Sequence, residues 1–146
     1  MKSKLVQDGR ERTFVLVLDA GDEIVATLLA FAEEYRLAGS HFTGIGAFER
    51  ATLGFFKVDR KDYKRIPIRE QVEVISLVGN IARDEAGKPK VHAHVVLGKS
   101  DGTAHGGHLL EGWVRPTLEV VLVESERHLR RKMNPQLGIP LIDTTE

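Results

Sequence analysis

The 146-residue sequence contains no cysteine. This absence excludes disulfides, thiolate catalysis and cysteine-based zinc sites, and it is typical of a cytoplasmic protein. An excess of either charge is also missing, because 21 basic residues balance 21 acidic ones. Binding to nucleic acid depends on Lys and Arg that neutralise phosphates, so the balanced charge argues against attraction of nucleic acid over the whole surface.

Long apolar runs are absent as well. The first ten residues carry charge but no apolar core of signal-peptide length, and the apolar runs elsewhere are too short and too interrupted to span a bilayer. The length and the 42% hydrophobic content are ordinary for one globular domain. We therefore expect a soluble, cytoplasmic protein without a membrane segment. It should form a single domain over residues 1–146, with its core over about 10–125 and a C-terminal tail over 126–146 that packs on the domain or on a neighbouring subunit.

Short β-branched and apolar segments dominate the chain and predict strands. They cover residues 13–19, 41–48, 51–58, 66–69, 71–81, 91–97, 105–113 and 117–124. A turn at Glu49 and Arg50 predicts a hairpin, and Pro116 should separate the last two strands. Glycines 44, 46 and 54 predict bulges or close backbone approach.

Helical spacing of apolar residues occurs once, between residues 23 and 38. Asp22 should cap the start of this helix, and Gly39 should end it. The tail after residue 124 shows no clear period. The sequence thus predicts an α+β fold: a mixed, mostly antiparallel β-sheet of seven or eight strands with one main early helix.

Four of the six histidines lie between Val91 and Gly112. Side chains alternate between faces along a strand, so His92 and His94 should share one face. A turn over residues 98–104 would bring His108, on the next strand, beside them. Neutral imidazole suits Zn, Cu, Fe and Ni. These three histidines therefore predict a site for a divalent metal, with Zn as the first candidate and an open position for water or substrate.

The alternative is that the three histidines are structural, hydrogen-bonded on a sheet face or at a trimer seam. Glu73, on the preceding strand, is a candidate to orient a metal ligand or to act as a general base, or else it is a carboxylate bonded to backbone. Asn80, Thr43 and Glu111 are further candidates with no independent support.

Other polar residues fit less specific roles. His105 is an odd number of residues from His108, so its side chain should point to the other face of the strand and be exposed, or lie in the turn. His41 should lie in a loop, unless a neighbouring subunit brings it to the site. His128 should belong to the solvated tail. Glycines at 44, 46, 106 and 107 could bind an anion through backbone N–H groups or could allow tight packing. The basic residues within 60–65 are mixed with Asp62 and Tyr63, which is typical of a solvated surface.

Three segments carry a resemblance to a known family: G-I-G-A-F at 44–48, E-V-I-S-L-V-G-N at 73–80, and the run from His92 to Val114 that contains H-A-H, G-G-H-L and G-W-V. In these segments the chain resembles the plant and prokaryote conserved (PPC) domain family, and the resemblance covers roughly residues 10–142. It implies an α+β domain with a mostly antiparallel sheet that assembles as a homotrimer. It also implies that prokaryotic members keep the histidines, whereas plant members lose them and keep the equivalent of Glu73.

Plant members of that family carry a DNA-binding AT-hook with the motif R-G-R-P. This motif is missing here, and the nearest basic cluster, Arg130 to Lys132, lacks its Gly and Pro. Two functions follow as hypotheses. The first is a homotrimeric metal-binding protein, with a small polar or carboxylate molecule as ligand or substrate in a cleft near the subunit interface. The second is a regulatory module that associates with DNA or a DNA-binding partner and has structural histidines. Charge and motif do not support direct DNA binding, whereas the usual assignment of the family favours it.

Overall fold

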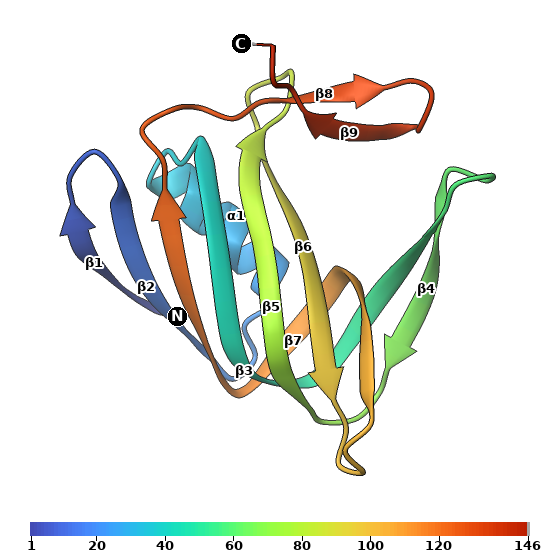
Figure 1. The fold of residues 1–146 in the computed structure, drawn as a ribbon. Coiled ribbons are helices and arrows are strands. Elements are labelled where there is room, and N and C mark those ends of the chain that lie inside the picture. The colour runs from blue at the N-terminus through green and yellow to red at the C-terminus, as the bar shows by residue number, and fades with distance from the viewer. Residues whose placement is uncertain (146) are drawn as a thin grey trace.

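The computed structural model of the protein describes residues 1–145, which form one α-helix and nine β-strands. Seven strands make one sheet in the order β1-β2-β7-β6-β5-β3-β4, with antiparallel pairing throughout and an additional β3–β7 pairing (Figure 1). Strands β8 and β9 form a separate hairpin. The predicted α+β class is confirmed. The elements are β1 (Lys2–Asp8), β2 (Arg12–Asp19), α1 (Ile24–Glu34), β3 (Gly39–Lys57), β4 (Asp62–Ile68), β5 (Val72–Arg83), β6 (Pro89–Gly98), β7 (Ala104–Glu124), β8 (Arg131–Asn134) and β9 (Ile139–Ile142).

The core lies between α1 and one face of the sheet. Alternate residues of the strands point toward the helix and are almost completely buried, because each strand exposes its other side chains on the opposite face. Phe14 of β2 and Phe31 of α1 meet edge to face, with ring centroids 5.2 Å apart. Each fully buried side chain of this size contributes roughly 1.5–3 kcal/mol. The opposite face of the sheet has no helix over it within the described chain (Figure 1).

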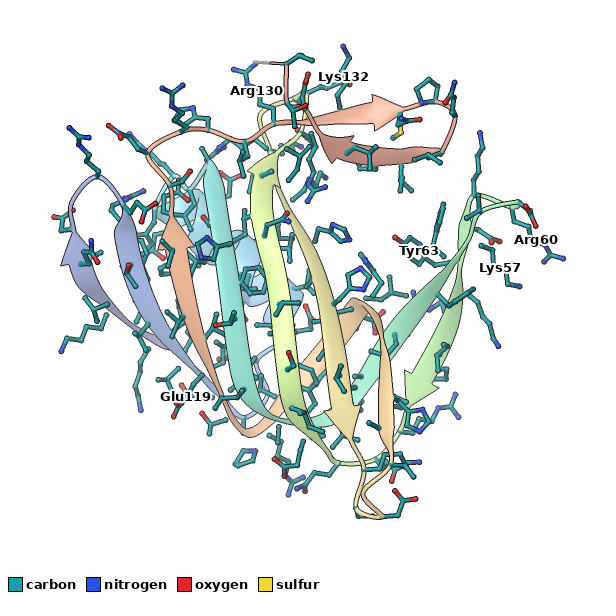
Figure 2. All side chains as sticks on the ribbon, viewed as in Figure 1. Lys57, Arg60, Tyr63, Glu119, Arg130 and Lys132 are labelled. Carbon is teal, nitrogen blue, oxygen red and sulfur yellow. The ribbon has the colours of Figure 1, made fainter. Side chains whose placement is uncertain are left out.

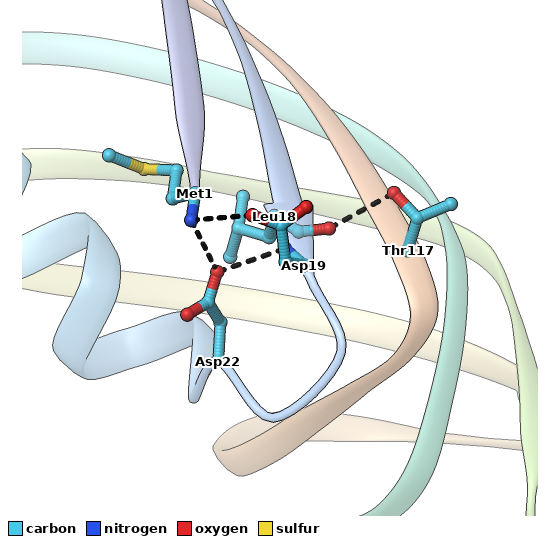
Figure 3. Close-up of polar contacts among 5 residues, drawn as sticks. All are labelled: Met1, Leu18, Asp19, Asp22 and Thr117. Atoms are coloured by element: carbon cyan, nitrogen blue, oxygen red, sulfur yellow. Dashed lines mark hydrogen bonds and ion pairs between the residues drawn. The ribbon is translucent and has the colours of Figure 1, made fainter.

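The helix begins and ends differently from the prediction. Glu23, not Asp22, caps it, because the Glu23 carboxylate accepts a hydrogen bond of 2.7 Å from the backbone N–H of Ala26. Asp22 instead accepts from the backbone N–H of Asp19 and pairs with the amino group of Met1 at 3.1 Å (Figure 3). The helix ends at Glu34 rather than near residue 38, so Gly39 begins β3 and does not cap the helix.

The predicted hairpin at Glu49 and Arg50 is wrong. Both residues lie inside β3, which continues without a turn and pairs Arg50 with Trp113 of β7. The strand bends instead near Gly46, where φ is +151° and the register with β5 shifts. A Cβ on Gly46 would lie 2.4 Å from the carbonyl oxygen of Thr117, so this close approach needs a glycine.

Pro116 also does not divide β7 into two strands. It follows a cis peptide bond from Arg115 and lies where the β3–β7 register is irregular, between the pairs Gly46–Leu118 and Phe48–Val114. Proline lacks a backbone N–H, and at this irregular point the pairing of β3 with β7 does not require a hydrogen bond from residue 116. One long strand therefore supplies His108 in its first half and core residues in its second half.

Two features were not predicted. β1 is an edge strand whose residues are all exposed, so it has no apolar alternation to reveal it. The hairpin of β8 and β9 consists of four-residue strands and lies across one end of the sheet (Figure 1). Among residues 1–145, no helix is both long and apolar enough to cross a membrane.

Candidate metal centre

Pairing among β5, β6 and β7 brings three histidines together. His94 of β6 lies directly opposite His108 of β7, and His92 lies opposite Asn80 of β5. Candidate ligand atoms of His92, His94 and His108 all lie within 4.8 Å of one another. Ala93 and Val95, which alternate with them, are 2% exposed and belong to the core. The expected sharing of a sheet face by the three imidazoles is therefore observed.

The turn between β6 and β7 sets this register. The backbone N–H of Lys99 donates to the carbonyl of Thr103 at 2.8 Å, and the Asp101 carboxylate accepts from the backbone N–H of Thr103 at 2.9 Å. Gly102 has a φ of +82°, a conformation that favours glycine. A tight turn of this geometry places residue 108 opposite residue 94, so the local sequence determines which histidines meet.

Gly79 on β5 allows β6, the strand that carries His92 and His94, to lie close to β5. A Cβ on Gly79 would lie 2.4 Å from Cζ of Phe42 in the core and 2.6 Å from the carbonyl oxygen of His92. Any larger residue there would push β6 away from β5, and His92 would move with it.

Burial keeps two of the imidazoles neutral. Desolvation, with smaller effects from His92, His94 and Arg131, lowers the pKa of His108 to about 4. Desolvation, the charge of Arg131 and the neighbouring His94 also lower the pKa of His92. Neutral imidazole is the form that binds a metal ion. At neutral pH these side chains therefore need to lose no proton before they act as ligands.

The donor atoms also fit a metal. The Nδ1 atom of His108 is buried and has no hydrogen-bond partner among the residues that the structure describes. An unpaired buried polar atom of this kind costs about 1–3 kcal/mol. Three histidines on neighbouring strands, one of which has a buried and unpaired ring nitrogen, are a chemically suitable set for a divalent transition metal.

The cluster opens into a cavity of about 620 Å³. His92 and His108 line one part of it, together with Asn80, Arg131 and Tyr63. The Tyr63 ring contacts the His108 ring, with centroids 4.8 Å apart. Figure 2 shows Tyr63 on β4, near the space between that strand and the β8–β9 hairpin. The β8–β9 hairpin lines another part of the cavity with apolar side chains, namely Met133, Ile139, Pro140, Leu141 and Ile142.

Glu73 does not lie beside the histidines within one chain. It is exposed and pairs with Gly98, four residues beyond His94 on β6. Four residues of strand span about 13 Å, too far for a carboxylate to orient an imidazole or to reach a molecule bound there. The predicted contact between Glu73 and the cluster is therefore not made in the subunit, because the extended strand carries the carboxylate to the other end of the sheet.

Of the three other candidates, only Asn80 lines the cavity. Asn80 belongs to the cavity and accepts a hydrogen bond from Arg131. Thr43 is exposed on β3 opposite Val78, and Glu111 forms an ion pair with Arg65 at 2.6 Å. These last two side chains have no contact with the cavity.

The three remaining histidines lie outside the cluster. His105 is exposed and pairs with Leu97, as its parity predicted. His128 is exposed in the segment before β8. His41 lies in β3 opposite Asn80 and not in a loop, because β3 begins two residues earlier than predicted.

Two residues of the cavity were missed from the sequence. Arg131 belongs to the basic run 130–132, in which nothing distinguishes it from its charged neighbours. It is 6% exposed, whereas Lys132 beside it is exposed. Tyr63 lies in a segment that was expected to be solvated. Residues 131–134 read R-K-M-N and show no alternation of charged and apolar residues, so no local pattern in the sequence marked Arg131 as buried.

The fold and the cluster together define a small α+β domain with a candidate metal centre on the face of its sheet. The model of the Plants and Prokaryotes Conserved (PCC) domain matches residues 6–126, and the chain belongs to this family. The resemblance to PPC proteins indicated by the histidine run and the 44–48 segment is thereby confirmed.

Several solved structures share this fold over almost the whole chain. A PPC protein from Pyrococcus horikoshii is 31% identical with a TM-score of 0.85, covering 99% of this chain and 96% of its own. A protein from Bacteroides thetaiotaomicron, described as a candidate DNA-binding protein, is 30% identical with a TM-score of 0.88 and 99% coverage of both chains. A metal-containing protein from Archaeoglobus fulgidus is 32% identical with a TM-score of 0.83, covering 97% of this chain and 96% of its own.

One curated relative is much longer. The bifunctional protein GlmU of Synechococcus sp. (strain JA-3-3Ab) is 30% identical over 133 residues, which make up 89% of this chain. The match spans only 20% of the length of that relative. The likeness therefore concerns one part of the longer protein.

Proposed function

We propose that this protein binds one divalent metal ion through His92, His94 and His108, with Zn as the first candidate. The observation that carries the proposal is the convergence of three histidines on one sheet face, with candidate ligand atoms within 4.8 Å of one another. In a tetrahedral zinc site with Zn–N distances of 2.0–2.1 Å, ligand nitrogens lie about 3.3 Å apart. Small rotations of the side chains would bring the three nitrogens to that spacing. The metal-containing relative from Archaeoglobus fulgidus supports this reading.

We propose further that the site acts on, or captures, a small polar or carboxylate molecule. Three protein ligands with a fourth position open to the cavity have the layout of catalytic zinc. A bound metal of this kind lowers the pKa of a coordinated water or polarises a carbonyl group. The chain itself would contribute neutral imidazoles that bind without losing a proton, a cavity lined in part by the β8–β9 hairpin, and the cation of Arg131.

A homotrimer is part of the same proposal. The sheet face opposite α1 exposes large apolar side chains that a lone subunit would leave in water. The members of this open-face patch are Ile45, Ile75, Val78, Val96 and Val121, which are 39–62% exposed. Burying such a patch between subunits would stabilise the assembly by the hydrophobic effect.

Elemental analysis of protein purified without a His-tag or chelator tests the metal site. We expect about one equivalent of metal per chain, lost when His92, His94 and His108 are all changed to Ala. The matched control changes the other three histidines, His41, His105 and His128, to Ala and should keep the metal. Circular dichroism establishes that both variants fold. Wild-type protein that contains no metal and takes up none on titration with Zn would contradict the proposal.

A second candidate function is association with DNA. The description of the Bacteroides thetaiotaomicron relative favours it, whereas the balanced charge and the missing R-G-R-P motif oppose it. Phosphate contacts should give an affinity that falls steeply as salt rises. Fluorescence anisotropy with duplex DNA at low and high salt measures this dependence. Absence of binding at low salt would exclude direct DNA binding by the isolated protein.

A further inference from the structure

Arg131 is a buried cation that has no anionic partner. Its side chain is 6% exposed, and two of its N–H groups donate to neutral oxygens: Asn80 Oδ1 and, at 3.3 Å, the carbonyl of Pro140. Its Nε is buried and unpaired. Within residues 1–145, no carboxylate forms an ion pair with this guanidinium.

The nearby acidic residues do not neutralise it. Asp84 and Glu85 also line the cavity, but the Asp84 carboxylate accepts hydrogen bonds from the backbone N–H groups of Ala86 and Lys88 and pairs with Lys90 at 3.5 Å. Only desolvation acts on the pKa of Arg131, which it lowers. Arginine nevertheless stays charged at neutral pH, because its ordinary pKa lies far above that range.

An isolated buried charge costs several kcal/mol unless an opposite charge compensates it. The guanidinium has five N–H donors in a planar fork, and two hydrogen bonds leave part of that fork available. This fork matches the two oxygens of a carboxylate, which makes Arg a frequent residue at carboxylate sites. The cavity therefore has a positive region whose preferred partner is a small anion.

The β8–β9 hairpin that carries Arg131 also gives the cavity an apolar lining. Met133 and Leu141 of the β8–β9 hairpin are 53% and 40% exposed, and both line the cavity with Ile139. Tyr63 adds an aromatic ring beside His108. The volume of about 620 Å³ is in the range of small-molecule sites. An inorganic anion would use the cation alone and leave this apolar wall in water.

We infer that this cavity binds a small organic carboxylate, with the carboxylate group on Arg131 and an apolar chain or ring on the β8–β9 hairpin. The inference rests on the proposed function, because it specifies the chemical class of the molecule that binds in the same cavity. Pairing with Arg131 does not require the metal, so the metal site and the carboxylate site can fail separately.

Isothermal titration calorimetry on metal-free, EDTA-dialysed protein tests the inference with benzoate as the probe. Benzoate should bind wild-type protein, and Arg131→Gln should weaken its binding at least tenfold. Lys132→Gln is the matched control: it removes the same charge from the next residue of β8, which is exposed and outside the cavity. This variant should bind benzoate like the wild type. Benzamide, which has the same ring without the charge, should bind at least tenfold more weakly than benzoate.

A second variant keeps the test informative if Arg131→Gln does not fold. Leu141→Ser, on the exposed apolar wall, should weaken benzoate binding severalfold and leave formate binding unchanged, because formate has no apolar part. The variant in which His92, His94 and His108 are Ala should still bind benzoate under EDTA.

Equal affinity of wild type and Arg131→Gln, no binding of benzoate, or inorganic phosphate binding as tightly as benzoate would overturn the inference. Loss of benzoate binding in the folded triple-histidine variant would also overturn it, since the carboxylate would then depend on the histidines. Metal content of Arg131→Gln, measured in parallel, reports on the metal site alone.

Discussion

At the scale of single residues, His108 shows how burial prepares a side chain for metal binding. Its ring lies between Tyr63 and the other two histidines, and desolvation lowers its pKa to about 4. In the unfolded chain its pKa returns to the ordinary value of 6.5. The difference between the two states makes the stability of the metal-free protein depend on pH.

We expect the free energy of unfolding of metal-free protein to fall as pH decreases from about 6.5 to about 4. In this window the unfolded state takes up a proton at residue 108 and the folded state does not. The loss should be roughly 1–2 kcal/mol, because solvent around the half-buried ring reduces the full effect of the shift. Urea unfolding in EDTA at several pH values measures it.

The comparison protein for this experiment is His108→Asn, in which the decline should be smaller. His105→Asn, at an exposed position on the same strand, should behave like the wild type. The carboxylates with lowered pKa, such as Asp84 and Asp101, add to the decline only near its acid end, because their ordinary pKa of 3.8 lies just below the window. An identical decline in His108→Asn would show that other groups cause the pH dependence.

At the scale of elements, Glu23 connects the helix to the sheet. One carboxylate oxygen accepts from the Ala26 N–H at the first turn of α1, and the other accepts from the Gly112 N–H of β7 at 3.0 Å. The same strand carries His108 four residues earlier. The helix is therefore fixed to the strand that supplies a candidate ligand, which helps to keep the cluster rigid.

Replacing Glu23 by Ala should lower the free energy of unfolding by about 1–2 kcal/mol, since the helix loses its cap and a backbone N–H loses its partner. Glu33→Ala removes an exposed carboxylate from the same helix and should change stability by less than about 0.5 kcal/mol. Chemical denaturation of both variants and the wild type measures the effect. Equal stability of the two variants would contradict the role assigned to Glu23.

At the scale of the whole molecule, the sheet has two unlike faces. One face packs on α1 (Figure 1), and the other exposes the open-face patch around Ile45. If three chains assemble through this patch, multi-angle light scattering should give about three times the 16.3 kDa of one chain. A mass equal to one chain would contradict the proposed homotrimer.

Ile45→Glu should dissociate the assembly, because a charge buried between subunits without a partner is strongly unfavourable. Val58→Glu is the control: Val58 is 63% exposed but lies after β3 and outside the patch, so this variant should keep the wild-type mass. If neither variant dissociates, the subunit interface lies elsewhere on the molecule.

Local sequence was sufficient for features that depend on neighbouring residues. The two-residue period of strands predicted that His92 and His94 share a face, and the polar turn after β6 predicted that His108 would join them. The helix was predicted from its apolar spacing, with errors only at its ends. These features follow from backbone geometry within some twenty residues, so they can be read from sequence.

Tertiary structure alone decided the rest of the cavity and the lengths of the long strands. Arg131 reaches Asn80 across 51 residues of sequence, and no local pattern encodes that contact. β3 and β7 run through Glu49–Arg50 and Pro116 because pairing with neighbouring strands outweighs local turn preference there. Glu73 shares a strand pair with the histidines but lies at its far end, since an extended chain separates residues quickly. The chain thus encodes the histidine cluster locally, whereas only the folded sheet determines what surrounds it.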